Sequence, residues 1–285
     1  MRRAIVLLLT ICCVALVTAT NRALLIGIGE YKKGTNWAKI HGDSDVELLM
    51  PLLKEQGFIV HSLTNDKATK EEIVKALNKL IDDCEAGDKV YFHFSGHGQP
   101  MEDINEDETT PFDQTMVPYD AGRVYIKNVY EGENHFVDDE YSYYLNALRK
   151  KLGNSGQLFI VIDACHSQGI ERGEITDSID VELAVRGTDD IFRFKDKQNL
   201  PSKTKPSAFS NGASTIIVSA CGKEERNYEY KTPSGKMYGS LSYCISRLLQ
   251  NDSDFERWII YFENERYRER RIFPQSQHPT IMVYQ

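Results

Sequence analysis

The feature that most constrains the fold is an alternation of short apolar runs with segments of helical periodicity. The runs predict buried strands, and the segments between them carry apolar side chains every three or four positions, as an amphipathic helix does. Strands that are connected through helices pair in parallel. The first strands are expected at residues 23–28, 58–63 and 89–94, and the first helices at residues 43–56 and 69–84.

The same alternation continues toward the carboxyl end. Further strands are expected at residues 114–118, 158–162, 215–220 and 280–284, and further helices at residues 139–152, 238–250 and 254–270. The sequence contains no internal repeat and no linker. We therefore expect one α/β domain, a three-layer α/β/α sandwich with a mostly parallel central sheet of about six strands.

The first 20 residues differ from the rest of the chain. Arg2 and Arg3 precede an apolar run at residues 4–17, and small residues follow it. This pattern predicts a signal peptide at residues 1–20 and a folded domain at residues 21–285, exported to the periplasm or the extracellular space. An uncleaved anchor is the alternative, but the run is shorter than the roughly 20 apolar residues that span a membrane. We expect a mature protein that is not embedded in a membrane.

Charge and cysteine content narrow the possible partners. The formal net charge is −8, and it becomes −10 if the leader is removed. An acidic protein is a poor general ligand for nucleic acid, so no nucleic-acid partner is expected. Four cysteines lie beyond the leader, and none has the CxxC spacing of a zinc knuckle or a thioredoxin-like motif. We expect no essential disulfide among Cys84, Cys221 and Cys244, and the oligomeric state is left open.

Two short motifs carry the candidate chemistry. Ser95-Gly96-His97-Gly98 and Asp163-Ala164-Cys165-His166-Ser167 each follow an apolar strand, and Cys165 lies 68 positions after His97. Because the carboxyl ends of parallel strands share one edge of a sheet, both side chains are expected in one site. A thiol beside an imidazole is an activated nucleophile. The alternative is a buried cysteine and a core histidine without a catalytic role.

The residues around the two side chains suit the same chemistry. The backbone amides of Gly98 and Cys165 are candidate donors to a developing oxyanion. Gly96 and Gly98 leave room for a substrate backbone. His166 is not the expected base, since adjacent side chains of an extended chain point apart.

The two motifs, taken as residues 94–98 and 163–169, resemble the paired signatures of metacaspases and bacterial caspase-like peptidases. Supporting similarities extend from about Asn21 to about Leu249, at residues 22–28, 40–46, 117–120, 219–221 and 238–242. The resemblance implies the caspase-haemoglobinase fold and a cysteine endopeptidase acting on polypeptides. It implies that Cys165 attacks the scissile carbonyl, and that His97 protonates the leaving amine and then activates water. It implies no cofactor for bond cleavage, and we assign no third catalytic residue.

The acid at position 163 bears on specificity. Caspases that cut after Asp have glutamine there and an arginine before the first helix, whereas this chain has Asp163 and no arginine in residues 36–45. The resemblance to metacaspases implies that Asp163 and a second acid line a pocket for Lys or Arg. Asp45 is the match for the second acid, and Asp43 is the runner-up. Paired carboxylates attract a cation and repel an aspartate. A strand-end cap for Asp163 and an ordinary helix-start acid for Asp45 are the alternatives.

Calcium is a further hypothesis for the loop between the motifs. Asp103, Asn105 and Asp107 alternate like the opening of an EF-hand loop, and many metacaspases are activated by calcium through acids in this region. The loop is not an EF-hand, because Glu108 stands where glycine is needed and Gln114 where glutamate is needed. A solvated acidic loop is the alternative.

Residues 170–212 form a long polar segment that we expect to be a mobile or processed loop. An enzyme that prefers basic residues can cut itself there, at Arg172, Arg186, Arg193, Lys195, Lys197, Lys203 or Lys205.

Two alternatives to an active metacaspase-like peptidase stay open. One is a catalytically silent binding module of the same fold, and the other is a different relative of the clan, such as a clostripain-like or gingipain-like peptidase.

Overall fold

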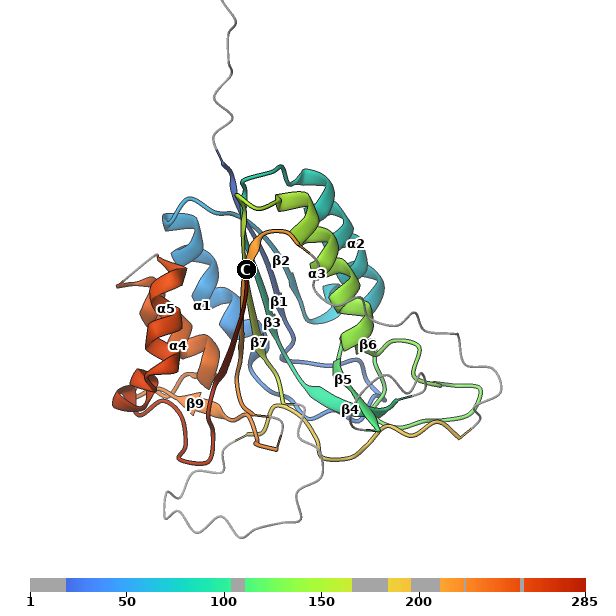
Figure 1. Ribbon diagram of the computed structural model, residues 1–285. Helices are drawn as coiled ribbons and strands as arrows, with labels where there is room; N and C mark the ends of the chain where they lie inside the picture. Colours follow the sequence, from blue (N-terminus) through green and yellow to red (C-terminus); the bar gives the residue numbers. More distant parts are fainter. Residues whose placement is uncertain (1–18, 104–110, 166–183, 196–210, 223, 252–253) are drawn as a thin grey trace, which may run out of the picture.

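A six-stranded sheet forms the centre of the molecule, and helices cover both of its faces (Figure 1). The computed structural model describes residues 19–103, 111–165, 184–195, 211–222, 224–251 and 254–285. The strand order is β11-β8-β7-β3-β1-β2, and only β11 runs antiparallel to its neighbour. The strands are β1 (Asn21–Gly27), β2 (Ile59–Thr64), β3 (Lys89–Ser95), β7 (Gln157–Asp163), β8 (Ser214–Ser219) and β11 (Thr280–Tyr284). The expected α/β/α sandwich with a mostly parallel sheet is confirmed.

The helices form two layers, one on each face of the sheet. One layer holds α1 (Gly42–Glu55), α4 (Ser240–Leu249) and α5 (Phe255–Glu263), and the other holds α2 (Lys70–Asp83) and α3 (Asp138–Leu152) (Figure 1). Successive residues of β1 belong to different cores. Ala23 and Leu25 pack with the first layer, whereas Leu24 and Ile26 pack with the second. This double burial explains why the strands read as continuous apolar runs.

Two small sheets lie outside the central one. An antiparallel sheet contains β4 (Gly98–Glu102), β5 (Phe112–Met116) and β6 (Phe136–Val137), and a hairpin contains β9 (Glu229–Lys231) and β10 (Met237–Gly239). Periodicity predicted only β5 among these strands. Residues 238 and 239, predicted to open a helix, belong to β10 instead, because they pair with Tyr230 and Glu229 of the hairpin before α4 begins at Ser240.

The expected single helix over residues 254–270 was wrong. α5 ends at Glu263, and Glu265 has a left-handed backbone with φ 52°. A separate 3₁₀ helix follows at Arg266–Arg270, and another short one lies at Asn65–Lys67. A non-glycine residue in the left-handed region interrupts an α-helix, which explains the division.

The pairing of β3 with β7 brings the two motifs together. Ser95 and Asp163 are opposite each other at the ends of these adjacent parallel strands. His97 and Cys165 each follow a paired residue by two positions, so they leave the sheet at the same level. The shared edge expected for these two residues is the one observed.

Some expectations concern segments outside the described residues. The signal peptide stays a prediction, because residues 1–18 are not described. No helix in the described part of the chain is long and apolar enough to cross a membrane. Cys84, Cys165, Cys221 and Cys244 all carry free thiols.

Candidate active site

The Cys165 thiol is fully buried at the end of β7. It donates a hydrogen bond to the carbonyl oxygen of Glu225 at 3.4 Å, and the Cys221 thiol donates to the same oxygen at 3.4 Å. The pKa of Cys221 is raised well above its usual range, first by its hydrogen bond with Cys165 and second by burial. Cys221 therefore stays a protonated neighbour, which leaves Cys165 as the candidate nucleophile of the pair.

The His97 ring has one nitrogen hydrogen-bonded and the other without a partner in the described part of the chain. Nε2 lies 2.9 Å from the carbonyl oxygen of Ala38, and Nδ1 is buried without a hydrogen-bond partner there. A carbonyl only accepts, so Nε2 carries the proton and Nδ1 holds the free electron pair in the neutral ring. The arrangement gives His97 a basic nitrogen in a defined tautomer.

Aromatic side chains surround that ring. Trp37 stacks on it with centroids 4.9 Å apart, and the Tyr31 hydroxyl accepts a hydrogen bond from the His97 backbone nitrogen at 2.7 Å. Burial lowers the pKa of His97 to about 4. The imidazole is neutral near pH 7, as a general base has to be before it takes up a proton.

The backbone amides of Cys165 and Gly98 point to one oxygen. Both donate to the carbonyl oxygen of Arg186, at 2.7 Å from the Cys165 nitrogen and 3.4 Å from the Gly98 nitrogen. Two amide donors on one carbonyl oxygen have the geometry of an oxyanion hole. They are the two amides that the sequence predicts for that role.

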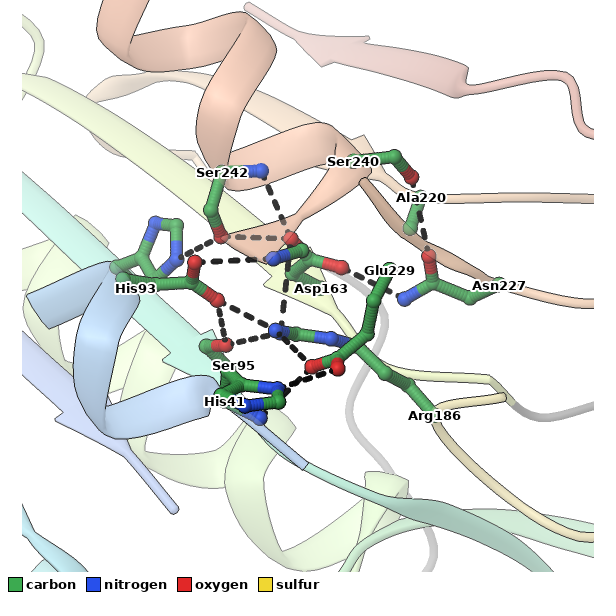
Figure 2. Close-up of polar contacts among 12 residues, drawn as sticks. His41, His93, Ser95, Asp163, Arg186, Ala220, Asn227, Glu229, Ser240 and Ser242 are labelled. Atoms are coloured by element: carbon green, nitrogen blue, oxygen red, sulfur yellow. Dashed lines mark hydrogen bonds and ion pairs between the residues drawn. The ribbon is translucent and has the colours of Figure 1, made fainter. Parts of the chain in front are cut away.

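The side chain of the same arginine ends in a buried acidic cage (Figure 2). Its Nη1 lies 2.7 Å from Asp45 and 3.8 Å from Asp163, and its Nη2 lies 2.8 Å from Glu229. We call Asp45, Asp163 and Glu229 the acidic cage; all four side chains are 0% exposed. Burial alone would lower the pKa of Arg186, but the three carboxylates raise it above its ordinary value, so the guanidinium stays charged.

Asp163 is held by three donors besides the arginine. Asn227 Nδ2 donates to one carboxylate oxygen at 2.6 Å, and the backbone nitrogen and hydroxyl of Ser242 donate to the other at 2.7 and 2.6 Å. Ser242 in turn lies 3.0 Å from His93 Nε2, and Tyr91 lies 3.0 Å from the other nitrogen of that ring. This chain of hydrogen bonds fixes the direction of the Asp163 carboxylate.

Asp45 sits in the first turn of α1 and faces the end of β3. The Ser95 hydroxyl donates to it at 2.6 Å, and the Gly239 backbone nitrogen donates at 3.0 Å. Burial raises the pKa of Asp45, and the guanidinium of Arg186 lowers it. Burial has the larger effect, so the pKa rises to about 6. The runner-up acid, Asp43, instead accepts hydrogen bonds from Asn65 and from the Ser44 backbone, outside the cage.

The sequence analysis assigned no pocket role to five residues of the site, namely Ser95, Arg186, Asn227, Glu229 and Ser242. Arg186 was noted only as one of seven basic residues in a long loop. Glu229 also binds His41, with 2.6 Å between a carboxylate oxygen and Nδ1. Ser95 and Ser242 lie in segments that carry the family resemblance, and Arg186 is one of the basic residues of the loop. No sequence signal pointed to Asn227 or Glu229, which tertiary contacts bring to the site.

The calcium hypothesis stays a prediction, because most of its loop lies outside the described residues. Asp103 is described, and its backbone nitrogen donates to the Pro111 carbonyl, whereas Asn105 and Asp107 lie outside the described residues. Within the described ranges, no group of three or more His, Cys, Asp or Glu side chains is placed to hold a metal ion.

Comparison with known proteins agrees with this geometry. The family model described as the caspase domain, peptidase C14, matches residues 20–270. The chain belongs to the caspase domain family. This caspase-domain chain resembles metacaspase-3 of Arabidopsis thaliana at 28% identity, over 81% of this chain and 59% of that protein. It resembles metacaspase-1 of Eremothecium gossypii at 31% identity, over 53% of this chain and 32% of that protein.

Two other comparisons cover most of the caspase-domain chain. Metacaspase-3 of Trypanosoma brucei brucei is 24% identical over 90% of this chain and 69% of its own length. A crystal structure of a Geobacter sulfurreducens protein superimposes with a TM-score of 0.63 and 20% identity, covering 93% of each chain. The last similarity supports the fold alone. The chain spans 59% and 32% of the lengths of the Arabidopsis and Eremothecium relatives.

Proposed function

We propose that this protein is a cysteine endopeptidase that cleaves polypeptides on the carboxyl side of arginine and, less efficiently, lysine. One observation carries the proposal. The guanidinium of Arg186 is enclosed by three buried carboxylates while its carbonyl oxygen accepts hydrogen bonds from the amides of Cys165 and Gly98. A substrate arginine bound in this way would present its carbonyl carbon beside the candidate nucleophile.

The chemistry follows from the two dyad residues. His97 Nδ1 takes the proton of the Cys165 thiol, and the sulfur attacks the substrate carbonyl carbon. The amides of Cys165 and Gly98 stabilise the negative charge that develops on the oxygen. His97 then protonates the leaving amine, and afterwards activates the water that releases the acyl group from the sulfur. Because Cys165 now donates to the Glu225 carbonyl, ionisation of the thiol has to break that hydrogen bond.

Arginine should be preferred to lysine. The two terminal nitrogens of the guanidinium reach different carboxylates, Asp45 and Glu229, and Nη1 also bonds to Ser95. A lysine ammonium is a single point charge and cannot reproduce this forked contact. An aspartate side chain would add a fourth carboxylate to the cage and would be excluded.

Export and calcium activation are separate parts of the proposal. The basic start and apolar run of residues 1–20 support export through a signal peptide. The alternating oxygen-bearing side chains of Asp103, Asn105 and Asp107 support calcium as an activator, without any role in bond cleavage. Assays should therefore include arms with calcium and with EDTA.

The deciding test uses fluorogenic peptides that differ only in the residue before the scissile bond. Arginine, lysine, glutamine and aspartate should be compared with wild-type protein and with the Cys165→Ala variant. We expect kcat/KM for arginine to exceed that for lysine, no cleavage after glutamine or aspartate, and no cleavage by the variant. Binding of arginine peptides without cleavage, and without alkylation of Cys165 by iodoacetamide, would instead identify a catalytically silent binding module.

A further inference from the structure

We propose that Arg226 and Arg123 form two subsites for acidic side chains, one for the third and one for the fourth residue after the scissile bond of a substrate. The inference rests on the proposed peptidase function and deepens it, because it adds a charge preference on the far side of the cleaved bond. The substrate class is then a polypeptide in which an arginine is followed, three and four residues later, by aspartate or glutamate.

The register of the two subsites comes from the position of Arg186. Its side chain fills the acidic cage, and its carbonyl oxygen accepts hydrogen bonds from the two candidate oxyanion-hole amides. Residues 187–190 therefore lie where the first four residues after the scissile bond of a bound peptide would lie. Asp189 and Asp190 mark the third and the fourth of these positions.

The backbone of this part of the chain pairs with β4, which is the outer strand of its small sheet. Gly187 forms a parallel bridge with Gly98, and the Thr188 nitrogen donates to the Gly98 carbonyl at 3.3 Å. Gln99 Nε2 donates to the Asp190 carbonyl at 3.0 Å. Pairing of an extended segment with a strand edge is a general mode of peptide recognition. A substrate that pairs with β4 in the same register would bring its third and fourth side chains to the same two places.

Arg226 receives the side chain at the third position. Its guanidinium pairs with the Asp189 carboxylate, and the two side chains are 35% and 29% exposed. Arg226 belongs to the loop after β8, next to Glu225, whose carbonyl oxygen accepts the hydrogen bond from the Cys165 thiol. The domain itself therefore holds this cation close to the nucleophile, and its partial exposure lets one carboxylate replace another there.

Arg123 receives the side chain at the fourth position. Its Nη2 lies 2.6 Å from the Asp190 carboxylate and donates to the Thr188 hydroxyl at 3.0 Å. The guanidinium lies over the Trp37 ring, with 5.8 Å to the centroid, and Trp37 stacks on His97. Stacking on an indole holds a guanidinium while its donors in the plane stay available for a carboxylate. Arg123 is thus placed beside the catalytic imidazole by contacts that do not involve the bound acid.

The two arginines give the site an electrical polarity. The chain has a formal net charge of −8, and three buried carboxylates surround the arginine that precedes the bond. On the other side of the bond, two cations meet the chain. A peptide with arginine before the bond and acids after it matches this arrangement, whereas lysine at the later positions would face a like charge.

The two positions are recognised by different parts of the domain. Asp189 and Asp190 are consecutive, but Arg226 lies in the loop after β8 and Arg123 lies between β5 and β6. Partly exposed ion pairs contribute little to stability, so the pairs are a weak clamp for a segment that is already paired with β4. They are sufficient for a severalfold preference among substrates, and each position can be tested alone.

The test uses internally quenched peptides with one arginine before the scissile bond and neutral residues elsewhere. Aspartate, asparagine or lysine is placed at the third or the fourth position after the bond, and kcat/KM is measured with the full chain. Wild type should prefer aspartate to asparagine by about two- to fivefold at each position, as expected for an exposed ion pair. Lysine should be the poorest residue, and the preferences should shrink at high ionic strength.

Each arginine should control one position. Arg226→Gln should lose the preference at the third position and keep that at the fourth, and Arg123→Gln should do the reverse. Arg226→Glu should prefer lysine to aspartate at the third position. Arg193→Gln removes the same charge from an exposed residue further along the segment and should keep both preferences.

The deciding quantity is the ratio of kcat/KM for the aspartate and asparagine peptides, taken within each variant. A substitution that only loosens residues 187–190 would change the cleavage of all peptides alike and would leave this ratio as in wild type. A ratio that changes only at the position assigned to the substituted arginine therefore reports contact with the substrate side chain.

The outcomes separate this inference from the proposed function. Cleavage after arginine at one rate, whatever residues follow, would overturn the two subsites and leave the peptidase proposal intact. Loss of both preferences in every arginine variant, Arg193→Gln included, would also overturn them, since net charge would then explain the preference.

If wild type cuts no peptide, binding of the same peptides to Cys165→Ala is measured by fluorescence anisotropy. Tighter binding of the aspartate peptides, lost position by position in the arginine variants, would support the subsites while the catalytic step of the proposed function fails. Binding without a charge preference, or no binding at all, would overturn the subsites.

Discussion

The carbonyl oxygen of Arg186 lies 2.7 Å from the backbone nitrogen of Cys165, and the arginine side chain ends between carboxylates from three different elements. This relationship joins the two halves of the site. Under the proposed function, Arg186 marks the positions that the carbonyl group and the side chain of a substrate arginine would take. Substitutions in the cage should therefore change recognition, and substitutions around His97 should change chemistry.

Replacing Asp45 by asparagine should raise KM for arginine peptides by about 10- to 100-fold, because a charge-assisted hydrogen bond to the guanidinium is lost. Asp43→Asn is the matched control, since it removes the same charge from the same turn of α1, and Asp43 accepts its hydrogen bonds from Asn65 and Ser44, outside the cage. KM and kcat of both variants should be measured beside those of wild type, with the same arginine peptide. Equal effects of the two changes would contradict the cage.

KM for arginine peptides should fall as pH rises from about 5 to about 8. Asp45 has a pKa of about 6 with the guanidinium in place, and the pKa rises further when the cation leaves. The charged groups that act on Asp45 are Arg186 and Asp163. Arg186 also pairs with Glu229, which in turn contacts His41. Protonation at low pH removes an ion pair, so acid weakens binding. The measurement is KM against pH for wild type and Asp45→Asn, and a variant that keeps the full dependence would refute this assignment.

The fall of kcat at low pH should reflect protonation of His97. Its pKa is lowered to about 4 by burial, so the neutral base persists down to about that pH. Trp37→Ala exposes the ring and should move the limb upward, toward the ordinary imidazole value near 6.5. Trp37→Phe keeps an aromatic cover and should restore most of the wild-type profile. A limb that does not respond to either change would show that another group limits kcat.

Gly239→Ala should abolish recognition of arginine. A Cβ at Gly239 would lie 2.6 Å from Nη1 of Arg186 and would also collide with Asp163, so it fills the space of the guanidinium. We expect loss of arginine cleavage, with alkylation of Cys165 by iodoacetamide retained. Gly222→Ala is the control, because the nearest atoms to its Cβ would be those of the Glu225 carboxylate, at 3.5 Å. Normal KM in Gly239→Ala would argue against this position of the substrate arginine.

Local sequence pattern was sufficient for the main elements and for the two dyad residues. Strands buried on both faces appear as apolar runs, and helices appear through periodicity, so β1, β3 and β7 were predictable. The motifs that contain His97 and Cys165 follow such strands directly. Parallel pairing then brings their ends together, which is why residues 68 positions apart were expected in one site.

Which of the two acids, Asp43 or Asp45, belongs to the acidic cage depends on their directions around the axis of α1. Residues two apart in a helix differ by about 200° around its axis, so only one of them can face the cage. Sequence alone favoured Asp45 through resemblance. The structure gives the physical reason, since Asp45 faces Ser95 and Arg186 while Asp43 faces Asn65.

The sequence by itself determined the layered α/β architecture, the shared sheet edge of the Cys165 thiol and the His97 imidazole, and the acid two positions before Cys165. Only the tertiary structure decided that Glu229 completes the cage, that Ser242 orients Asp163, and that Arg186 lies in the site. The reason is that strand and helix patterns are local, whereas each of these contacts joins segments distant in sequence. In the sequence, Arg186 cannot be told apart from the other basic residues of its loop. Only the fold places three carboxylates around its side chain and two backbone amides at its carbonyl oxygen.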